Sequence, residues 1–190
     1  MNFTQDWFTL NIPHLTNLIK LLPEKKSILE IGCFEGKSTC WFLENVLDAD
    51  GTIVCIDPFT GSEEHKDLNL SDLYKTFNAN VSEIAKITQD VKIYAEISYT
   101  ALARLIIQKE KFDLIYIDGS HHAADVMTDA CMAWGLLKSK GIMVFDDYNW
   151  NMPNLTYRET PKAAVDRFEQ LFDDQFQIVH NDYQVALQKL

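Results

Sequence analysis

The stretch Ser27-Ile28-Leu29-Glu30-Ile31-Gly32-Cys33-Phe34-Glu35-Gly36-Lys37-Ser38-Thr39 decides the fold. It begins as a short apolar run that contains an acid, and its two glycines then favour a tight turn. A second apolar run at 52–56 ends in Asp57. The pattern predicts a strand, a glycine loop, a helix and a second strand with a carboxylate at its tip. Such a unit suits an adenosine-type ligand, because glycine lets the backbone approach and the acid accepts from ribose hydroxyls.

The glycine loop differs from two better-known nucleotide loops. It lacks the G-x-G-x-x-G of a dinucleotide loop. Gly36-Lys37-Ser38 is similar to the end of a phosphate loop, but Ile31 stands where that loop requires its first glycine. Two glycines led by an acid therefore favour a cofactor that carries an amino group over one that carries a pyrophosphate.

The pattern Glu30-x-Gly32-x-x-x-Gly36-x-Ser38 resembles motif I of class I S-adenosylmethionine (SAM) dependent methyltransferases. Asp57 matches the acid that follows their second strand, and segments 112–121 and 141–148 look like their fourth and fifth strands. The resemblance implies a Rossmann-like α/β three-layer sandwich. Its sheet is expected to be mostly parallel and seven-stranded, with a C-terminal antiparallel strand pair.

Strands and helices alternate along the chain, which predicts a mostly parallel sheet covered on both faces. We expect strands at 27–31, 52–56, 91–95, 112–117 and 141–145, and a closing antiparallel pair at 176–180 and 183–187 around Asn181 and Asp182. We expect helices at 13–22, 37–48, 71–87, 99–108, 122–137 and 161–172. Without a linker or repeat, residues 1–190 are expected to form a single domain with the helix 13–22 packed on it.

Composition limits the partners of the chain. Its 190 residues carry a net charge of −11 and no run of basic residues, which disfavours nucleic acid and anionic membranes as partners. No apolar stretch approaches the roughly 20 residues that span a bilayer. Four cysteines without a C-x-x-C pair, and no visible signal peptide, favour reduced thiols in a cytoplasmic protein.

Three carboxylates follow two strands that the fold makes neighbours. Asp118 ends one strand, and Asp146 and Asp147 end the next. Neighbouring strands lie about 4.8 Å apart, so the three charges would repel unless a cation lay between them. Carboxylate oxygens favour a hard divalent cation, and Mg²⁺ is the expected ion. The alternative is that Asp118 caps the next helix and that Asp146 and Asp147 are turn residues.

His121 is a candidate general base, because imidazole can accept a hydroxyl proton near neutral pH. Asp-Gly-Ser-His after the fourth strand, with paired acids after the fifth, is similar to the metal-dependent, macrocin-type sugar O-methyltransferases. That resemblance implies Asp118, Asp146 and Asp147 as metal ligands, and His121 with Asp118 as catalytic residues. His122 is an alternative base, and either histidine could instead cap the following helix.

The same resemblance implies a set of cofactor contacts. Glu30 would bind the amino group of SAM, Asp57 the ribose hydroxyls, and Ser38 either the carboxylate or the start of its own helix. The full set of expected contacts is Glu30, Gly32, Gly36, Ser38, Asp57, Glu96, Ser98 and Asp118.

The function expected from these patterns is SAM-dependent O-methylation of a small-molecule hydroxyl, assisted by Mg²⁺. A SAM-binding protein without transferase activity is the alternative. The loop 148–157 is rich in aromatic and apolar residues, so it is expected to form a wall for the acceptor, a contact in a homodimer, or packing at the sheet edge.

Overall fold

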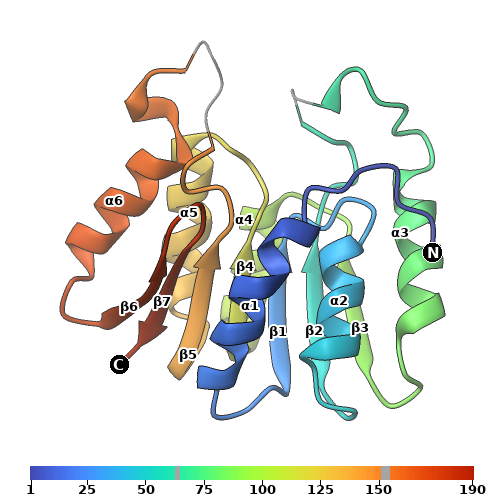
Figure 1. Ribbon diagram of the computed structural model, residues 1–190, viewed down its shortest axis with the longest axis horizontal. Coiled ribbons are helices and arrows are strands. Elements are labelled where there is room, and N and C mark those ends of the chain that lie inside the picture. Colours follow the sequence, from blue (N-terminus) through green and yellow to red (C-terminus); the bar gives the residue numbers. More distant parts are fainter. Residues whose placement is uncertain (63–64, 151–154) are drawn as a thin grey trace.

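The computed structural model of the chain describes residues 1–62, 65–150 and 155–190. Figure 1 shows a central sheet with helices on both faces. The seven strands lie in the order β3-β2-β1-β4-β5-β7-β6. Neighbours among β1 to β5 pair in parallel, whereas β7 pairs antiparallel with both β5 and β6. The expected three-layer fold with its C-terminal antiparallel pair is confirmed.

The bounds of the elements follow the predicted alternation. The strands are β1 Ser27–Ile31, β2 Thr52–Ile56, β3 Asp90–Tyr94, β4 Phe112–Ile117, β5 Leu137–Phe145, β6 Phe176–Asn181 and β7 Val185–Lys189. The helices are α1 Ile12–Leu18, α2 Lys37–Asn45, α3 Leu73–Ile84, α4 Ser98–Gln108, α5 Ala123–Trp134 and α6 Pro161–Leu171, with short 3-10 turns at Thr9–Asn11, Ile19–Leu21 and Tyr157–Glu159. No helix within the described ranges is long and apolar enough to cross a bilayer.

Two hydrophobic clusters form the core, one on each face of the sheet. Side chains alternate along each strand, so Ile28 packs with α1, α2 and α3, whereas Leu29 packs with α4, α5 and α6. The parallel strands β1, β2 and β4 are buried almost throughout, as expected for a sheet covered on both faces. This packing fixes the carboxyl ends of these strands relative to one another.

Some predicted element boundaries were wrong, because strand pairing extends or shifts the elements. The apolar pattern of the helix expected at 122–137 continues through Leu136 and Leu137, but α5 ends at Trp134 and Leu137 pairs with Phe112 of β4. The chain reversal before β7 spans residues 182–184 instead of 181–182. As a result, Gln184 lies at the end of that turn, where it reaches the carboxyl end of β5.

A segment that is irregular up to the 3-10 turn Thr9–Asn11 lies before α1. We call residues 1–11 the N-terminal strap, which Figure 1 shows in dark blue, running from α1 to the vicinity of α3. The backbone N–H and hydroxyl of Thr4 donate to Glu35 at 2.6 and 2.8 Å, and Asp6 pairs with Lys37 at 2.6 Å. These bonds hold the strap against the glycine loop and the start of α2.

Candidate active site

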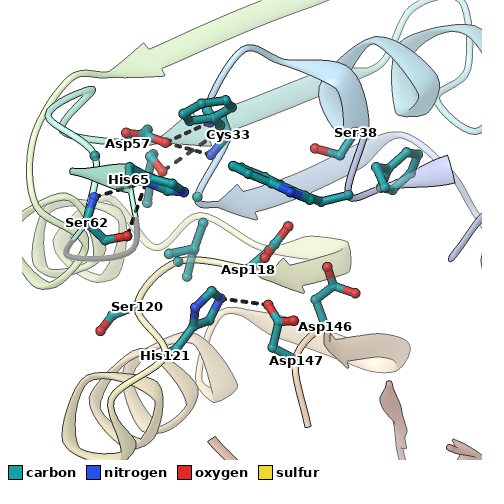
Figure 2. A pocket seen from close by; sticks show the side chains of 18 of the residues that line it. Cys33, Ser38, Asp57, Ser62, His65, Asp118, Ser120, His121, Asp146 and Asp147 are labelled. Atoms are coloured by element: carbon teal, nitrogen blue, oxygen red, sulfur yellow. Dashed lines mark hydrogen bonds and ion pairs between the residues drawn. The ribbon is translucent and has the colours of Figure 1, made fainter. Parts of the chain in front are cut away.

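A cavity of about 760 Å³ opens at the carboxyl ends of the central strands. Figure 2 shows Asp57 and Cys33 on one side of it, and Asp118, Asp146, Asp147 and His121 gathered on the other. The wall is formed by parts of the strap, the glycine loop and the loops that follow β2, β3, β4 and β5, together with Tyr183. The loops predicted to carry the chemistry therefore border one space.

The two glycines of the loop are required by contacts with different parts of the fold. Gly32 has a φ of +86°, and a Cβ there would lie 1.9 Å from the carbonyl oxygen of Asp118. Gly36 has a φ of +82°, and a Cβ there would lie 2.9 Å from the ring of Phe77 on α3. Gly32 lines the cavity and Gly36 does not. The second glycine is thus required by its left-handed backbone and by helix packing.

Glu30 does not lie on the cavity wall among the described residues. The alternation of β1 turns its side chain towards α2, where it is fully buried and accepts hydrogen bonds from the hydroxyls of Ser38 and Thr39. Burial raises the pKa of Glu30 to about 7, although these two hydrogen bonds act to lower it. Glu30 therefore links the end of β1 to the first turn of α2 through Ser38 and Thr39.

Asp57 lies on the wall and organises the glycine loop. Its Oδ2 accepts from the backbone N–H groups of Cys33 and Phe34 at 2.8 and 2.9 Å, and its Oδ1 accepts from that of Phe59 at 2.6 Å. An ionised carboxylate has about four acceptor positions. The three backbone bonds leave acceptor capacity for a hydroxyl of a bound ligand.

The segment after β3 contributes one of its two predicted contacts. Ser98, the first residue of α4, lines the cavity. Glu96 is absent from the described lining and pairs with Arg104 at 3.2 Å. A cofactor contact by Glu96 was inferred from its place after β3, but its side chain turns to α4 instead.

The three predicted acids Asp118, Asp146 and Asp147 lie close together, and His121 lies beside them. Ile117 of β4 pairs with Phe145 of β5, so the residues that follow these strands meet. Possible ligand atoms of Asp118, His121 and Asp147 all lie within 4.8 Å of one another. His121 Nε2 lies 2.7 Å from Asp147 Oδ2.

Asp146 is held differently from its two neighbours. Its Oδ1 accepts from Asn11 Nδ2 at 2.7 Å and from the side-chain amide of Gln184. Neither donor was identified from the sequence, because one lies in the N-terminal strap and the other in the reversal before β7. Both donors reach Asp146 only through the tertiary fold, and no local pattern marks them.

The charges of the cluster act on one another. Burial raises the pKa of Asp118 well above its usual range, and the charges of Asp146 and Asp147 raise it further. Burial and the charge of Asp147 raise the pKa of Asp146 to about 6. Burial opposes the ionisation of Asp147 as well, but the hydrogen bond and charge of His121 outweigh it and lower the pKa of Asp147. Crowded carboxylates of this kind favour a bound cation.

The alternative base, His122, lies away from the cavity, whereas part of the aromatic loop 148–157 borders it. His122 is exposed at the start of α5 and is not part of the described lining. Trp150 lines the cavity, with its ring 4.4 Å from that of His121. Tyr148 is buried and donates to Asp166 at 2.8 Å, and residues 151–154 of the predicted loop 148–157 lie outside the described residues.

Sequence reasoning also missed an aromatic group at the cavity. The rings of Trp7, Phe34 and His65 lie 5.0 to 5.2 Å apart and join the strap, the glycine loop and the loop after β2. All three residues line the cavity. Only their shared position in space connects them, because they come from three segments far apart in the chain.

Comparisons with known proteins agree with this geometry. Residues 29–148, more than half of the chain, match a family model described as a methyltransferase domain. A curated relative, the uncharacterized protein R132 of Acanthamoeba polyphaga mimivirus, is 28% identical over 160 residues. That match covers 82% of this chain, which spans 64% of the length of the relative.

Solved structures share the fold. An O-methyltransferase from Bacillus cereus, in complex with S-adenosylhomocysteine (SAH), has a TM-score of 0.64 and 20% identity, with 98% of this chain and 84% of that chain covered. MycE, a methyltransferase of the mycinamycin biosynthetic pathway in complex with Mg and SAH, has a TM-score of 0.63 and 17% identity. The match covers 100% of this chain and 51% of MycE.

Proposed function

The chain belongs to the methyltransferase-domain family whose model it matches over residues 29–148, and on this basis we propose that it methylates a hydroxyl oxygen of a small molecule with SAM as donor. One observation carries the proposal. The glycine loop and Asp57 border the same cavity as the cluster of Asp118, His121 and Asp147. A cofactor site and a polar centre for an acceptor thus share one space.

The residues at the strand ends that border the cavity support a position for the cofactor. Its ribose hydroxyls would bond to Asp57, and its amino-acid part would lie beside the glycine loop. Ser38, at the start of α2, lines the cavity and is within reach of the same part. Its hydroxyl already donates to Glu30, so a carboxylate of SAM would compete for that donor. The carboxyl ends of parallel strands are the usual ligand position in such sheets.

The cluster fits a divalent cation. Asp118 and Asp147 would hold it, with Asp146 as a further donor, because carboxylate oxygens suit a hard divalent ion. Such an ion, when bound, neutralises the crowded carboxylates and lowers the pKa of a nearby hydroxyl. That MycE is in complex with Mg supports Mg²⁺ as the ion.

His121 takes the proton of the acceptor. Asp147 lies against its Nε2 and stabilises the imidazolium that forms, while the hydroxyl of Tyr183 donates to the other oxygen of Asp147 at 3.0 Å. Trp150 packs on the imidazole ring and limits its rotation. With its proton removed, the acceptor oxygen would be the nucleophile for the methyl group that bound SAM would supply, and the shared cavity would bring the two ligands together.

The charge of the lining narrows the acceptor class. The described lining carries the acids Asp6, Glu35, Asp57, Asp118, Asp125, Asp129, Asp146 and Asp147. Lys37 is the one Lys or Arg among the described lining residues, and it pairs with Asp6 at 2.6 Å. The chain has no Lys or Arg at 63–64 or 151–154 either. Beyond the reach of the proposed cation, an acceptor that is uncharged or cationic fits this wall, whereas a phosphate or carboxylate there would meet repulsion.

A two-stage experiment tests the proposal. Calorimetry with SAH first asks whether the cofactor binds. A panel of hydroxylated sugars, phenols and catechols is then assayed for SAM-dependent methylation with and without Mg²⁺, each neutral compound beside its carboxylated or phosphorylated analogue. We expect binding, turnover with neutral or cationic acceptors, and at least tenfold lower kcat/KM for the anionic partner. Failure to bind SAH would overturn the assignment, and binding without turnover across the panel would favour a SAM-binding protein.

A further inference from the structure

Asp146 is held by buried donors that come from both ends of the chain. Its Oδ1 accepts from Asn11 Nδ2 at 2.7 Å and from Nε2 of Gln184. The hydroxyl of Tyr116 hydrogen-bonds to the same carboxyl group, and Gln184 Nε2 lies 3.3 Å from that hydroxyl. All three donors are buried, so water does not compete for these bonds. The carboxyl group of Asp146 therefore has little freedom to rotate.

The backbone places both amide donors. Val185 of β7 pairs with Phe145 of β5, so the antiparallel register sets Gln184 opposite Asp146, one step beyond that pair. Asn11 ends the 3-10 turn before α1, where its backbone N–H donates to the carbonyl oxygen of Phe8 at 2.9 Å. The two amides thus reach Asp146 because the strap and the last strand of the chain are themselves fixed.

The amide of Gln184 indicates a role beyond stability. This side chain is 1% exposed, and its Oε1 has no hydrogen-bond partner within residues 1–62, 65–150 and 155–190. A buried acceptor without a donor lowers stability, so an apolar side chain of similar size would serve packing alone better. What the amide supplies is its N–H donors, which face Asp146 and Tyr116.

These donors leave one acceptor position on Asp146. An ionised carboxylate has about four such positions, and the bonds from Asn11, Gln184 and Tyr116 occupy three of them. The remaining position faces Asp118, because the carboxyl groups of Asp118 and Asp146 hydrogen-bond to each other. A carboxylate held in this way can bind a cation beside Asp118 without first turning.

We propose that Asn11 and Gln184 are positioning residues for the divalent cation, and that they act by fixing Asp146 for coordination. The proposal rests on the proposed function, because it takes Asp146 and its neighbouring acids to bind the ion. Both residues lie outside residues 29–148, so the match to the family model assigns them no role. Hydrogen bonds to a ligating carboxylate orient it for the metal, and their loss typically weakens metal binding by roughly 10- to 100-fold.

Calorimetry with MgCl₂, and separately with SAH, tests the proposal on the whole chain. Gln184→Leu and Asn11→Ala each remove an amide donor, so each should weaken the binding of Mg²⁺ by roughly 10- to 100-fold. The affinity for SAH should stay close to that of the wild-type protein, a split that a merely structural role would not produce. The EPR signal of free Mn²⁺, which falls as the ion binds, gives a second measure of metal affinity.

Gln188→Leu is the matched control. Gln188 is a buried glutamine on the same strand, and its amide donates to the backbone carbonyls of Leu21 and Lys140. The variant therefore loses two hydrogen bonds of a similar kind, but outside the described lining of the cavity. It should bind Mg²⁺ like the wild-type protein. Circular dichroism and thermal unfolding check that each variant is folded, and Asn11→Ala decides the question if Gln184→Leu does not fold.

The outcomes separate the two proposals. No binding of SAH to the wild-type protein overturns the proposed function. Binding of SAH without binding of Mg²⁺ overturns the metal site and this inference with it, while the cofactor site stands. Binding of Mg²⁺ that Gln184→Leu or Asn11→Ala leaves unchanged overturns the role assigned to that residue. Equal weakening in Gln188→Leu would also overturn the inference, because the effect would then be one of general stability.

Discussion

The Nε2 atom of His121 lies 2.7 Å from Oδ2 of Asp147, on the wall of the cavity that the glycine loop also borders. Asp147 is itself fixed by the hydroxyl of Tyr183. The imidazole is therefore oriented by a carboxylate that cannot easily turn away. This arrangement is typical of a histidine that exchanges a proton with a ligand.

His121→Ala should lower turnover by roughly 10² to 10⁴ and leave the affinity for SAH nearly unchanged, because general base catalysis is lost and the cofactor site is not touched. Initial rates and calorimetry measure the two effects. His122→Ala is the matched control, since His122 is the exposed neighbour outside the described lining. Near-normal turnover in His121→Ala, or a loss in His122→Ala instead, would reject the assignment.

Asp57→Ala should weaken SAH binding by about 10- to 100-fold, because a hydrogen bond to a charged group contributes roughly 1.5–3 kcal/mol. Asp57 also holds the backbone of Cys33 and Phe34, so thermal unfolding must be measured beside calorimetry. Asp50→Ala, an exposed acid paired with Lys26, is the control. Unchanged affinity for SAH in a folded Asp57→Ala protein would remove Asp57 from the cofactor site.

Removal of divalent cations should abolish turnover, and added Mg²⁺ should restore it, because the crowded carboxylates of Asp118, Asp146 and Asp147 need a counter-charge. Dialysis against a chelator, followed by titration of Mg²⁺ in the methylation assay, measures the effect. Asp118→Asn should weaken the binding of Mg²⁺ in calorimetry. Full activity in excess chelator would contradict the metal site while leaving the cofactor site intact.

Glu30 should make the protein less stable as the pH rises. Its pKa is about 7 in the folded protein and 4.5 as a reference, so the folded state binds the extra proton and its stabilisation is complete below about pH 4.5. That stabilisation, on the order of 3 kcal/mol, is lost as the pH rises through 7. Urea unfolding at pH 5 and pH 8 measures this effect. The free energy of unfolding should fall less between the two pH values for Glu30→Gln than for the wild-type protein. Glu44 is an exposed acid on α2, so Glu44→Gln is the control and should behave like the wild type. Equal losses in all three proteins would show that Glu30 does not titrate in this range.

The order of the elements could be read from the sequence because it depends on local periodicity and on glycines at strand ends. Asp57, Asp118 and Asp147 reach the cavity because a parallel sheet places the carboxyl ends of its strands at one edge. Glu30 also lies near such an end, yet it turns away, since strand alternation assigns it to the α2 face. The sequence thus predicts which residues lie near the end of a strand. The face of the sheet on which a side chain lies depends on where the strand begins and ends, to within one residue.

The residues that escaped sequence analysis are those brought in by tertiary packing. Asn11 and Gln184 meet at Asp146 from opposite ends of the chain. Trp7 reaches Phe34 and His65 through the N-terminal strap, which has no periodic pattern to mark it. Asp129 would be taken for a polar position on a helix, because its burial depends on α4 and on the loop after β4.

Gly32 has a consequence for anyone who would redesign the enzyme for a new acceptor. Any side chain at this position would collide with the carbonyl oxygen of Asp118, so the loop proposed to bind the cofactor and the acid proposed to lie beside the acceptor share one backbone contact. A mutant library that varies residue 32 or the backbone around 118–119 would disturb both ligands at once. Diversity is better directed to Trp7 and Trp150, whose side chains border the same cavity from segments that this contact does not join.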